Sequence, residues 1–202
     1  VVGAKAIAIG NGVDLVRFQP SPEAPLARRL LFIGSFAHRP NVLALEFFLK
    51  EVFPRLRDVT LHVIAGQNHT RFWDLQHPGA EVEGFVSDVR PAYRAATVVI
   101  APLVASAGTN VKIVEAMAMG KAIVSTEAGI HGLELTRGKD VLVSDDPDEF
   151  ARLISHLLDH PTERTALEAH ARSTVEQVYG WPAMARVQKQ LYRELLQLPP
   201  KD

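Results

Sequence analysis

The feature that most constrains the fold is an alternation of short apolar runs, Gly-containing loops and helical patterns along most of the chain. This alternation is typical of a parallel sheet whose strands are joined by crossover helices. Several runs are apolar throughout, as expected when helices cover both faces of the sheet. We predict strands at residues 6–9, 30–33, 60–65, 81–83, 98–101, 122–125 and 141–143, and helices at residues 41–52, 71–76, 89–95 and 110–119.

The pattern changes after residue 143, where three helical stretches follow one another with no strand between them. They cover residues 148–158, 162–178 and 182–196, and Pro147, Pro161 and Pro182 mark their first turns. A proline is tolerated there because the first N–H groups of a helix have no partner within the helix. The predicted fold class is therefore α/β, as one domain over residues 1–202 with a helical C-terminal extension over residues 147–198.

Composition excludes several classes of protein. The 22 Lys and Arg residues nearly balance the 23 Asp and Glu residues, which leaves no broad positive field for nucleic acid or an anionic membrane. With no cysteine, disulfides, thiol catalysis and thiolate metal sites are excluded, and a cytoplasmic location is favoured. No apolar run approaches the roughly 18 residues that cross a bilayer, and no signal peptide pattern is present, so we expect a soluble protein.

The sequence also lacks the short motifs of several enzyme classes. It has no G-x-G-x-x-G after the first strand, no G-x-x-x-x-G-K-[ST] and no G-x-S-x-G. These absences argue against a dinucleotide oxidoreductase, a P-loop NTPase and a hydrolase with a nucleophile elbow. The eight histidines show no metal-ligand spacing, so we predict neither a metal nor a cofactor.

Glycines follow five of the predicted strands. In an open parallel sheet, ligands bind beyond the carboxyl ends of the strands. Glycine lets backbone approach a ligand closely, so five such loops on one edge indicate a ligand site there. The loops are residues 34–39, 66–70, 84–87, 102–110 and 126–132.

The most informative segment is residues 105–120. Gly108 frees the backbone, Thr109 or Asn110 can cap the helix that follows, and the positive end of that helix faces the strand edge. Together they form an anion cradle in which Lys112 adds charge, with Glu115 one turn further on the same face. The alternative is that Lys112 and Glu115 are an ordinary i,i+3 pair on a solvated helix.

A second candidate for anion binding lies after the strand at residues 30–33. His38 and Arg39 stand before Pro40-Asn41 at the start of a predicted helix. They either bind phosphate or are exposed loop residues, and the residues alone leave the two interpretations open.

As an ordered set, several motifs resemble the retaining GT-B glycosyltransferases of family 4. Residues 9–20, IGNGVDLVRFQP, are similar to the motif that links the two halves of such enzymes. Residues 32–36 and 39–42 are similar to the first strand and phosphate loop of one branch of the family. Further matches, in order, are residues 82–89, 101–103, 108–125 and 132–133. The resemblance covers nearly the whole chain and corresponds to the C-terminal, donor-binding half of the enzyme.

The resemblance implies a Rossmann-like half of a GT-B fold that serves metal-independent glycosyl transfer with retention. The donor would be a UDP-, GDP- or ADP-linked sugar. Glu115 would accept hydrogen bonds from the ribose hydroxyls, and the N–H groups of Gly108, Thr109 and Asn110 would meet the diphosphate. Lys112 would stabilise the departing nucleotide diphosphate, so Lys112 and Glu115 are the implied catalytic residues.

Two further loops acquire roles from the resemblance. Gly34 and Ser35 would approach the same phosphates, whereas Gly84, Phe85 and Val86 would border the base. Each of these assignments is an expectation about one position of the matching motifs.

The sequence departs from the family pattern at two positions. Ala107 stands where a glutamate commonly contacts the donor sugar, so the choice of donor sugar stays open. Ser35 stands at a position that many members fill with arginine. Arg39 is one candidate substitute for that arginine, and Lys112 is the stronger one.

The resemblance also implies that an N-terminal acceptor-binding domain is missing from this chain. A cleft with one wall removed neither excludes water nor aligns an acceptor, so we expect the chain alone to bind nucleotide weakly and transfer nothing. Any peripheral membrane contact would be made through the missing domain. The last helix resembles the segment that crosses back to that domain, and its apolar face, expected to be partly uncovered, comprises Met184, Val187, Leu191, Tyr192 and Leu195.

Two other functions remain compatible with the sequence. One is a stand-alone module that binds nucleotide or phosphate in the same cradle without chemistry. The other is a nucleotide-sugar epimerase with GT-B architecture.

Overall fold

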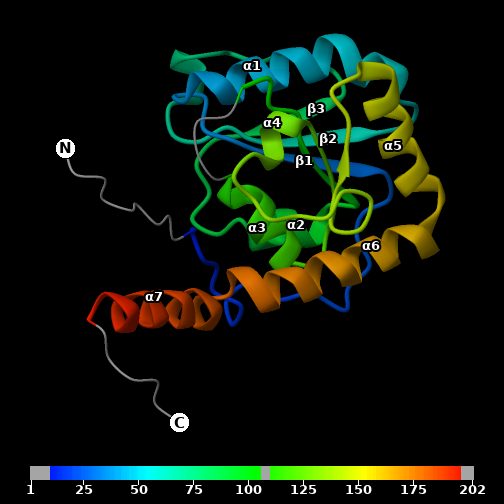
Figure 1. The fold of residues 1–202 in the computed structure, drawn as a ribbon. Coiled ribbons are helices and arrows are strands. Elements are labelled where there is room, and N and C mark those ends of the chain that lie inside the picture. The colour runs from blue at the N-terminus through cyan, green and yellow to red at the C-terminus, as the bar shows by residue number, and fades with distance from the viewer. Residues whose placement is uncertain (1–9, 106–109, 197–202) are drawn as a thin grey trace.

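The computed structural model describes residues 10–105 and 110–196, and Figure 1 shows its fold. The predicted strand at residues 6–9 lies outside this part of the chain. In the described residues, six strands form one sheet in the order β3-β2-β1-β4-β5-β6, and every neighbouring pair is parallel. The strands are β1 (Arg29–Ile33), β2 (Thr60–Ile64), β3 (Ala80–Glu83), β4 (Val98–Ala101), β5 (Ala122–Ser125) and β6 (Leu142–Val143). The predicted α/β class is confirmed.

Helices cover both faces of the sheet. In Figure 1, α1 (Arg39–Phe47) lies above the strands, whereas α2 (Arg90–Ala95) and α3 (Val111–Ala118) lie below them. Right-handed crossovers require this arrangement, because the chain steps one way from β1 to β3 and the other way from β3 to β5. Apolar side chains therefore fill both faces, and the central strands β4 and β5 are buried along their whole length.

The C-terminal helices confirm the three predicted stretches. They are α5 (Pro147–Asp159), α6 (Pro161–Thr174) and α7 (Trp181–Leu195), with a π-helical turn at Val175–Tyr179 between the last two. The side chain of Asp146 caps α5 by accepting a hydrogen bond from the N–H of Glu149, at 2.8 Å. Within the two described ranges, no helix is long and apolar enough to cross a membrane.

One predicted helix is wrong. Residues 71–76 contain no α-helix, and only a short 3-10 turn at His69–Arg71 occurs there. The ring of partly buried Trp73 packs on Phe36 with centroids 5.3 Å apart, and Leu75 is buried. In a helix, residues two apart lie about 200° apart around the axis, so a short helix would not turn both side chains toward the core. A short helix that the sequence did not predict, α4 (Glu127–Ile130), follows β5 and is capped by Thr126.

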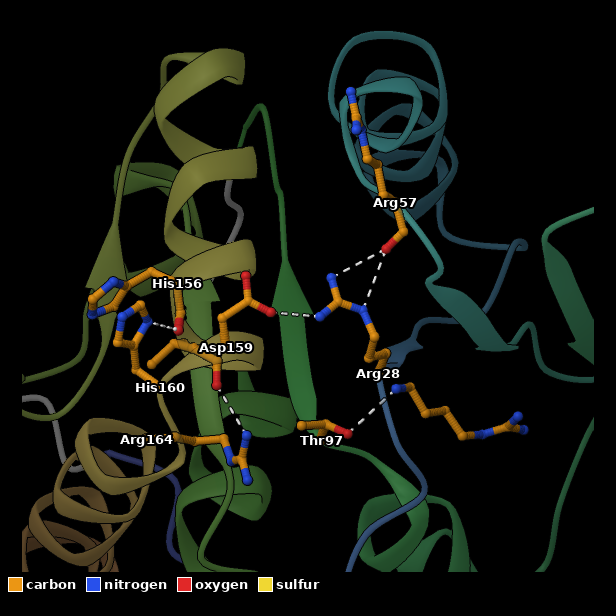
Figure 2. Close-up of polar contacts among 9 residues, drawn as sticks. Arg28, Arg57, Thr97, His156, Asp159, His160 and Arg164 are labelled. Carbon is orange, nitrogen blue, oxygen red and sulfur yellow. Dashed lines mark hydrogen bonds and ion pairs between the residues drawn. The ribbon is translucent and has the colours of Figure 1, made fainter.

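The amino ends of the strands are held by a network of paired charges and carbonyls (Figure 2). Arg28, just before β1, donates to the carboxylate of Asp159 at 2.6 Å and to the carbonyl oxygen of Arg57 at 3.1 Å. Nearby, Arg164 of α6 donates to the carbonyl oxygen of Leu157 at 2.9 Å. These contacts fasten the end of α5 to the start of β1 and to α6.

Helix α3 has a sharply defined end. Gly120 adopts a φ of +63°, in the left-handed region that favours glycine, and its N–H donates to the carbonyl oxygen of Met117 at 3.0 Å. A Cβ at Gly120 would also lie 3.1 Å from Cγ of Pro20. The left-handed backbone at Gly120 thus defines where α3 ends, after Ala118.

Candidate functional site

The candidate site lies at the carboxyl ends of β1 and β4, where the strand order reverses. From β1 the chain runs through β2 to β3 on one side, and from β4 it continues to β5 and β6 on the other. Open parallel sheets bind ligands at such a switch point. Helices α1 and α3 begin at this edge and turn their positive ends toward it.

Lys112 lies in the first turn of α3, as predicted, and it is partly buried. Its Nζ donates a hydrogen bond to Oδ1 of Asn41 at 2.9 Å and lies 4.9 Å from the ring centroid of Phe32. The ring face favours a cation at that distance. Burial nevertheless lowers the pKa of Lys112 to about 8, because within residues 10–105 and 110–196 no carboxylate compensates for the lost hydration.

Asn41 connects Lys112 to the loop after β1. It is the third residue of α1 and only 8% exposed, and its Nδ2 donates to the carbonyl oxygen of Ser35 at 3.0 Å. A Cβ at Gly34 would lie 2.6 Å from Cγ of Asn41, so only glycine leaves room for this amide. The structure therefore brings Gly34, Ser35 and Lys112 together around one buried side chain.

Glu115 is held by a different element. The hydroxyl of Tyr93 in α2 lies 3.0 Å from Oε2 of Glu115 and 3.1 Å from the carbonyl oxygen of Lys112, and its one proton can be donated to either. Burial raises the pKa of Glu115, whereas the Tyr93 hydroxyl and the positive charge of Arg17 act to lower it. Burial also raises the pKa of Tyr93 well above its usual value, so Tyr93 stays a hydrogen-bond donor.

Lys112 and Glu115 form no ion pair with each other in the described part of the chain. The alternative of an ordinary solvated i,i+3 pair is therefore not what the structure shows. Each side chain is instead partly buried and held by one uncharged group from a neighbouring element.

The start of α3 agrees only in part with the sequence prediction. Gly108 and Thr109 lie outside the described residues. Asn110 occupies the N-cap position, but its side chain makes no capping hydrogen bond. Its Nδ2 instead donates to the carbonyl oxygen of Gly129 at 2.5 Å, which ties the start of α3 to α4. Of the two predicted caps, the Asn110 side chain does not cap α3, because a buried carbonyl takes its amide, and Thr109 stays a prediction.

The loop after β1 is placed partly as expected. Gly34 donates to the carbonyl oxygen of Ile64 at 2.9 Å, which fixes the loop to the end of β2. Ser35 is exposed at the same edge. Arg39 is the first residue of α1 and is also exposed, and within residues 10–105 and 110–196 its side chain makes no hydrogen bond or ion pair. The structure does not bring Arg39 into contact with Lys112.

The loop after β3 forms a separate part of the edge. Gly84 accepts a hydrogen bond from the N–H of Gly66 at 3.3 Å, and Phe85 is 65% exposed. Val86 faces a cavity of about 330 Å³ whose lining includes neither Lys112 nor Glu115. Phe85 is therefore available to a ligand at this edge, whereas Val86 lines a cavity separate from Lys112 and Glu115.

Sequence reasoning missed Asn41, Tyr93 and Phe32 as parts of the site. In the sequence, Asn41 follows Pro40 at a helix start and lies in the matching motif at residues 39–42, but neither observation gives its side chain a role. A polar residue directly before the apolar pair Val42 and Leu45 was the available signal, since it places an amide beside the buried face of α1. Tyr93 and Phe32 give no such signal, because both also fit an ordinary core.

Within the described residues, no group of three or more His, Asp or Glu side chains could hold a metal ion. The candidate site consists instead of one ammonium group, one carboxylate and backbone N–H groups at the starts of two helices. Such a set is suited to an anion that also carries hydroxyl groups.

The fold and this edge define an α/β protein of the GT-B class. The structure superimposes on that of Anabaena HepE in complex with UDP-glucose with a TM-score of 0.72 and 18% identity, covering 94% of this chain and 57% of that one. It also covers the whole of a structure of the C-terminal domain of a group 1 glycosyl transferase from Francisella tularensis, with a TM-score of 0.64 and 18% identity over 84% of this chain.

Residues 27–160 match the family described as glycosyl transferases group 1, and the chain belongs to this family. A phosphatidyl-myo-inositol mannosyltransferase of Mycolicibacterium smegmatis is 26% identical over 91% of this chain. The chain spans 50% of the length of that relative.

Proposed function

We propose that this chain is the donor-binding half of a retaining, metal-independent glycosyltransferase that takes a nucleotide-diphosphate sugar. The observation that carries the proposal is the ammonium group of Lys112, held at the switch point of the sheet in the first turn of α3. Among the described residues this ammonium has no carboxylate partner, and such a cation beside two helix starts suits a diphosphate. The complex of HepE with UDP-glucose, which has the same fold, supports a nucleotide sugar as the ligand.

Glu115 would bind the ribose hydroxyls of the donor. Its Oε2 lies 3.0 Å from the Tyr93 hydroxyl, and a carboxylate has lone pairs on both oxygens, so Glu115 can still accept hydrogen bonds from a diol. Gly34 and Ser35 would approach the diphosphate, and Gly84 and Phe85 would border the base. The roles of Arg39, Val86, Gly108, Thr109 and Asn110 remain predictions from the sequence.

The acceptor would be bound by a part of the protein outside this chain. The C-terminal domain from Francisella tularensis and the half-length match to the mannosyltransferase support that division. Helix α7 extends beyond the sheet domain in Figure 1, and its predicted apolar face is confirmed as partly uncovered, with Val187, Tyr192 and Leu195 exposed. We expect the other half to cover this face. A cytoplasmic location remains a prediction.

The proposal is tested by titrating the chain with UDP, GDP and ADP. We expect one of the three to bind, and both Lys112→Ala and Glu115→Ala to weaken it at least about tenfold, or about 1.4 kcal/mol. Lys139→Ala is the matched control, because it removes an exposed lysine away from the site. If both site variants bind like this control, the site assignment is wrong.

A further inference from the structure

Two hydrogen bonds of one buried amide connect the loop after β1 to α3. Nδ2 of Asn41 donates to the carbonyl oxygen of Ser35, and Oδ1 of Asn41 accepts from Nζ of Lys112. We propose that Asn41 is the positioning residue for Lys112, holding its ammonium group beside the Gly34–Ser35 loop where a diphosphate would bind. The identity of the ligand in this inference rests on the proposed function. The geometry rests on contacts observed within the chain itself.

The chemistry of the two partners fixes the orientation of the amide. A lysine ammonium only donates hydrogen bonds and a backbone carbonyl only accepts them. The oxygen of Asn41 must therefore face Lys112, and its nitrogen must face Ser35. Glycine at position 34 leaves the space that this amide occupies, since a Cβ there would lie 2.6 Å from Cγ of Asn41. An asparagine thus satisfies both partners, whereas aspartate would turn an oxygen toward a carbonyl oxygen.

The hydrogen bond from Lys112 to Asn41 stabilises the charged form of the lysine, and the other described groups that face its ammonium are uncharged. The group that faces its ammonium from α1 is the uncharged Asn41, and from β1 it is the ring of Phe32. Glu115, on α3 itself, is engaged by Tyr93 of α2. Burial is the cause that shifts the Lys112 pKa, and no neighbouring charge in the described part of the chain contributes to that shift. An incoming diphosphate would supply the missing negative charge and raise that pKa.

The test measures the pKa of Lys112 by NMR titration of lysine side chains in the free chain, with Lys112→Arg to assign the signal. In Asn41→Asp, a carboxylate replaces the amide, and we expect the Lys112 pKa to rise by at least about one pH unit. Asn41→Leu has a similar shape but no acceptor, and we expect the pKa to fall. Because Asn41→Leu is a separate variant, the test survives if Asn41→Asp does not fold.

Asn68→Asp is the matched control, since it adds the same charge in an exposed loop at the same edge of the sheet. We expect it to change the Lys112 pKa much less than Asn41→Asp does. If neither Asn41 variant moves the Lys112 pKa further than Asn68→Asp, the positioning role is overturned.

A second measurement follows UDP affinity against pH. Affinity should fall as Lys112 loses its proton, and the midpoint of that fall should move to lower pH in Asn41→Leu. A merely structural role would weaken binding equally at every pH, and this result would overturn the proposal. The NMR titration needs no nucleotide, so a chain that shows the pKa shifts but binds no nucleotide would support the role of Asn41 and refute the proposed function.

Discussion

Each end of α3 has a lysine, partly buried at the N-terminal end and buried just beyond the C-terminal end, and the two lysines have different partners. Lys121, just beyond the C-terminal end, donates to the carbonyl oxygens of Arg94 and Ala96, both at 3.0 Å. Lys112, at the N-terminal end, donates to the single amide oxygen of Asn41. An ammonium has three N–H donors. In the described part of the chain, Lys121 uses two of them for hydrogen bonds within the fold, whereas Lys112 uses one and has two left to donate to a ligand.

The charges around the two lysines also differ: they stabilise the ammonium group of Lys121 but not that of Lys112. Burial lowers the pKa of Lys121, but the carboxylate of Glu168 in α6 acts against the shift. The carbonyls that Lys121 binds lie at the C-terminal end of α2, where a cation is also favoured by the helix dipole. Lys112 lies at the opposite, positive end of a helix, and none of the described residues supplies a compensating carboxylate. The electrostatic surroundings of Lys112 are unfavourable for a cation, which indicates that it binds an anionic ligand. The surroundings of Lys121 are favourable, which indicates that it stabilises the fold.

The largest expected effect concerns Lys121. Lys121→Met removes the donor from two carbonyls beside a buried position, and we expect the free energy of unfolding to fall by about 3 kcal/mol. The matched change Lys112→Met leaves only one amide oxygen without its donor, and we expect it to cost less than about 1 kcal/mol. Urea denaturation at neutral pH measures both. Equal losses in the two variants would break the contrast between the ends of α3.

A smaller effect is expected in the pH dependence of stability. The pKa of Lys112 is about 8 in the folded chain against 10.5 ordinarily, so between these values the unfolded chain binds a proton that the folded chain has released. Stability contributed by Lys112 therefore rises with pH across this range. Because the residue is partly exposed, we expect a gain of only about 1 kcal/mol relative to Lys112→Met. Urea denaturation from about pH 7 to about pH 10 measures it, and parallel curves would contradict it.

The smallest effect concerns the carboxylate beside Lys112. Tyr93→Phe removes the hydroxyl that contacts Oε2 of Glu115, and we expect the Glu115 pKa to rise because that hydroxyl stabilises the charged form. Nucleotide affinity should fall about threefold, or about 0.7 kcal/mol, less than in Glu115→Ala. NMR titration and nucleotide binding measure the two changes. Tyr192→Phe, at an exposed position of α7, is the control and should change neither.

The fold was predictable because each element carries its own local pattern. The five predicted strands from residue 30 to residue 125 all lie within one residue of where the structure has them. The helix predicted at residues 71–76 failed because packing of Trp73 against Phe36, far away in sequence, decides the backbone there. Tertiary contacts of that kind leave no periodic signal.

The sequence predicts the charged residues of the site but not the uncharged residues that hydrogen-bond to them. Lys112 and Glu115 lie on α3 as expected, since both their spacing and the helix pattern are local. Asn41 is 71 residues away from Lys112 and Tyr93 is 22 residues away from Glu115, so nothing in the local sequence pairs them. The loop with Gly108 and Thr109 lies outside the described residues, and the roles predicted for these two residues remain predictions.

Because the end of α3 is fixed, the site tolerates insertions and deletions at some positions of the chain and not at others. Gly120 lies two residues after Ala118, the last residue of α3, and seven residues separate it from Lys112. Inserting or deleting one residue between them would rotate Lys112 by about 100° around the helix axis. Its ammonium would then leave Asn41 and face away from the loop after β1. Evolution or engineering can thus lengthen the loop before α3, but the count from Lys112 to Gly120 sets the direction of the charge.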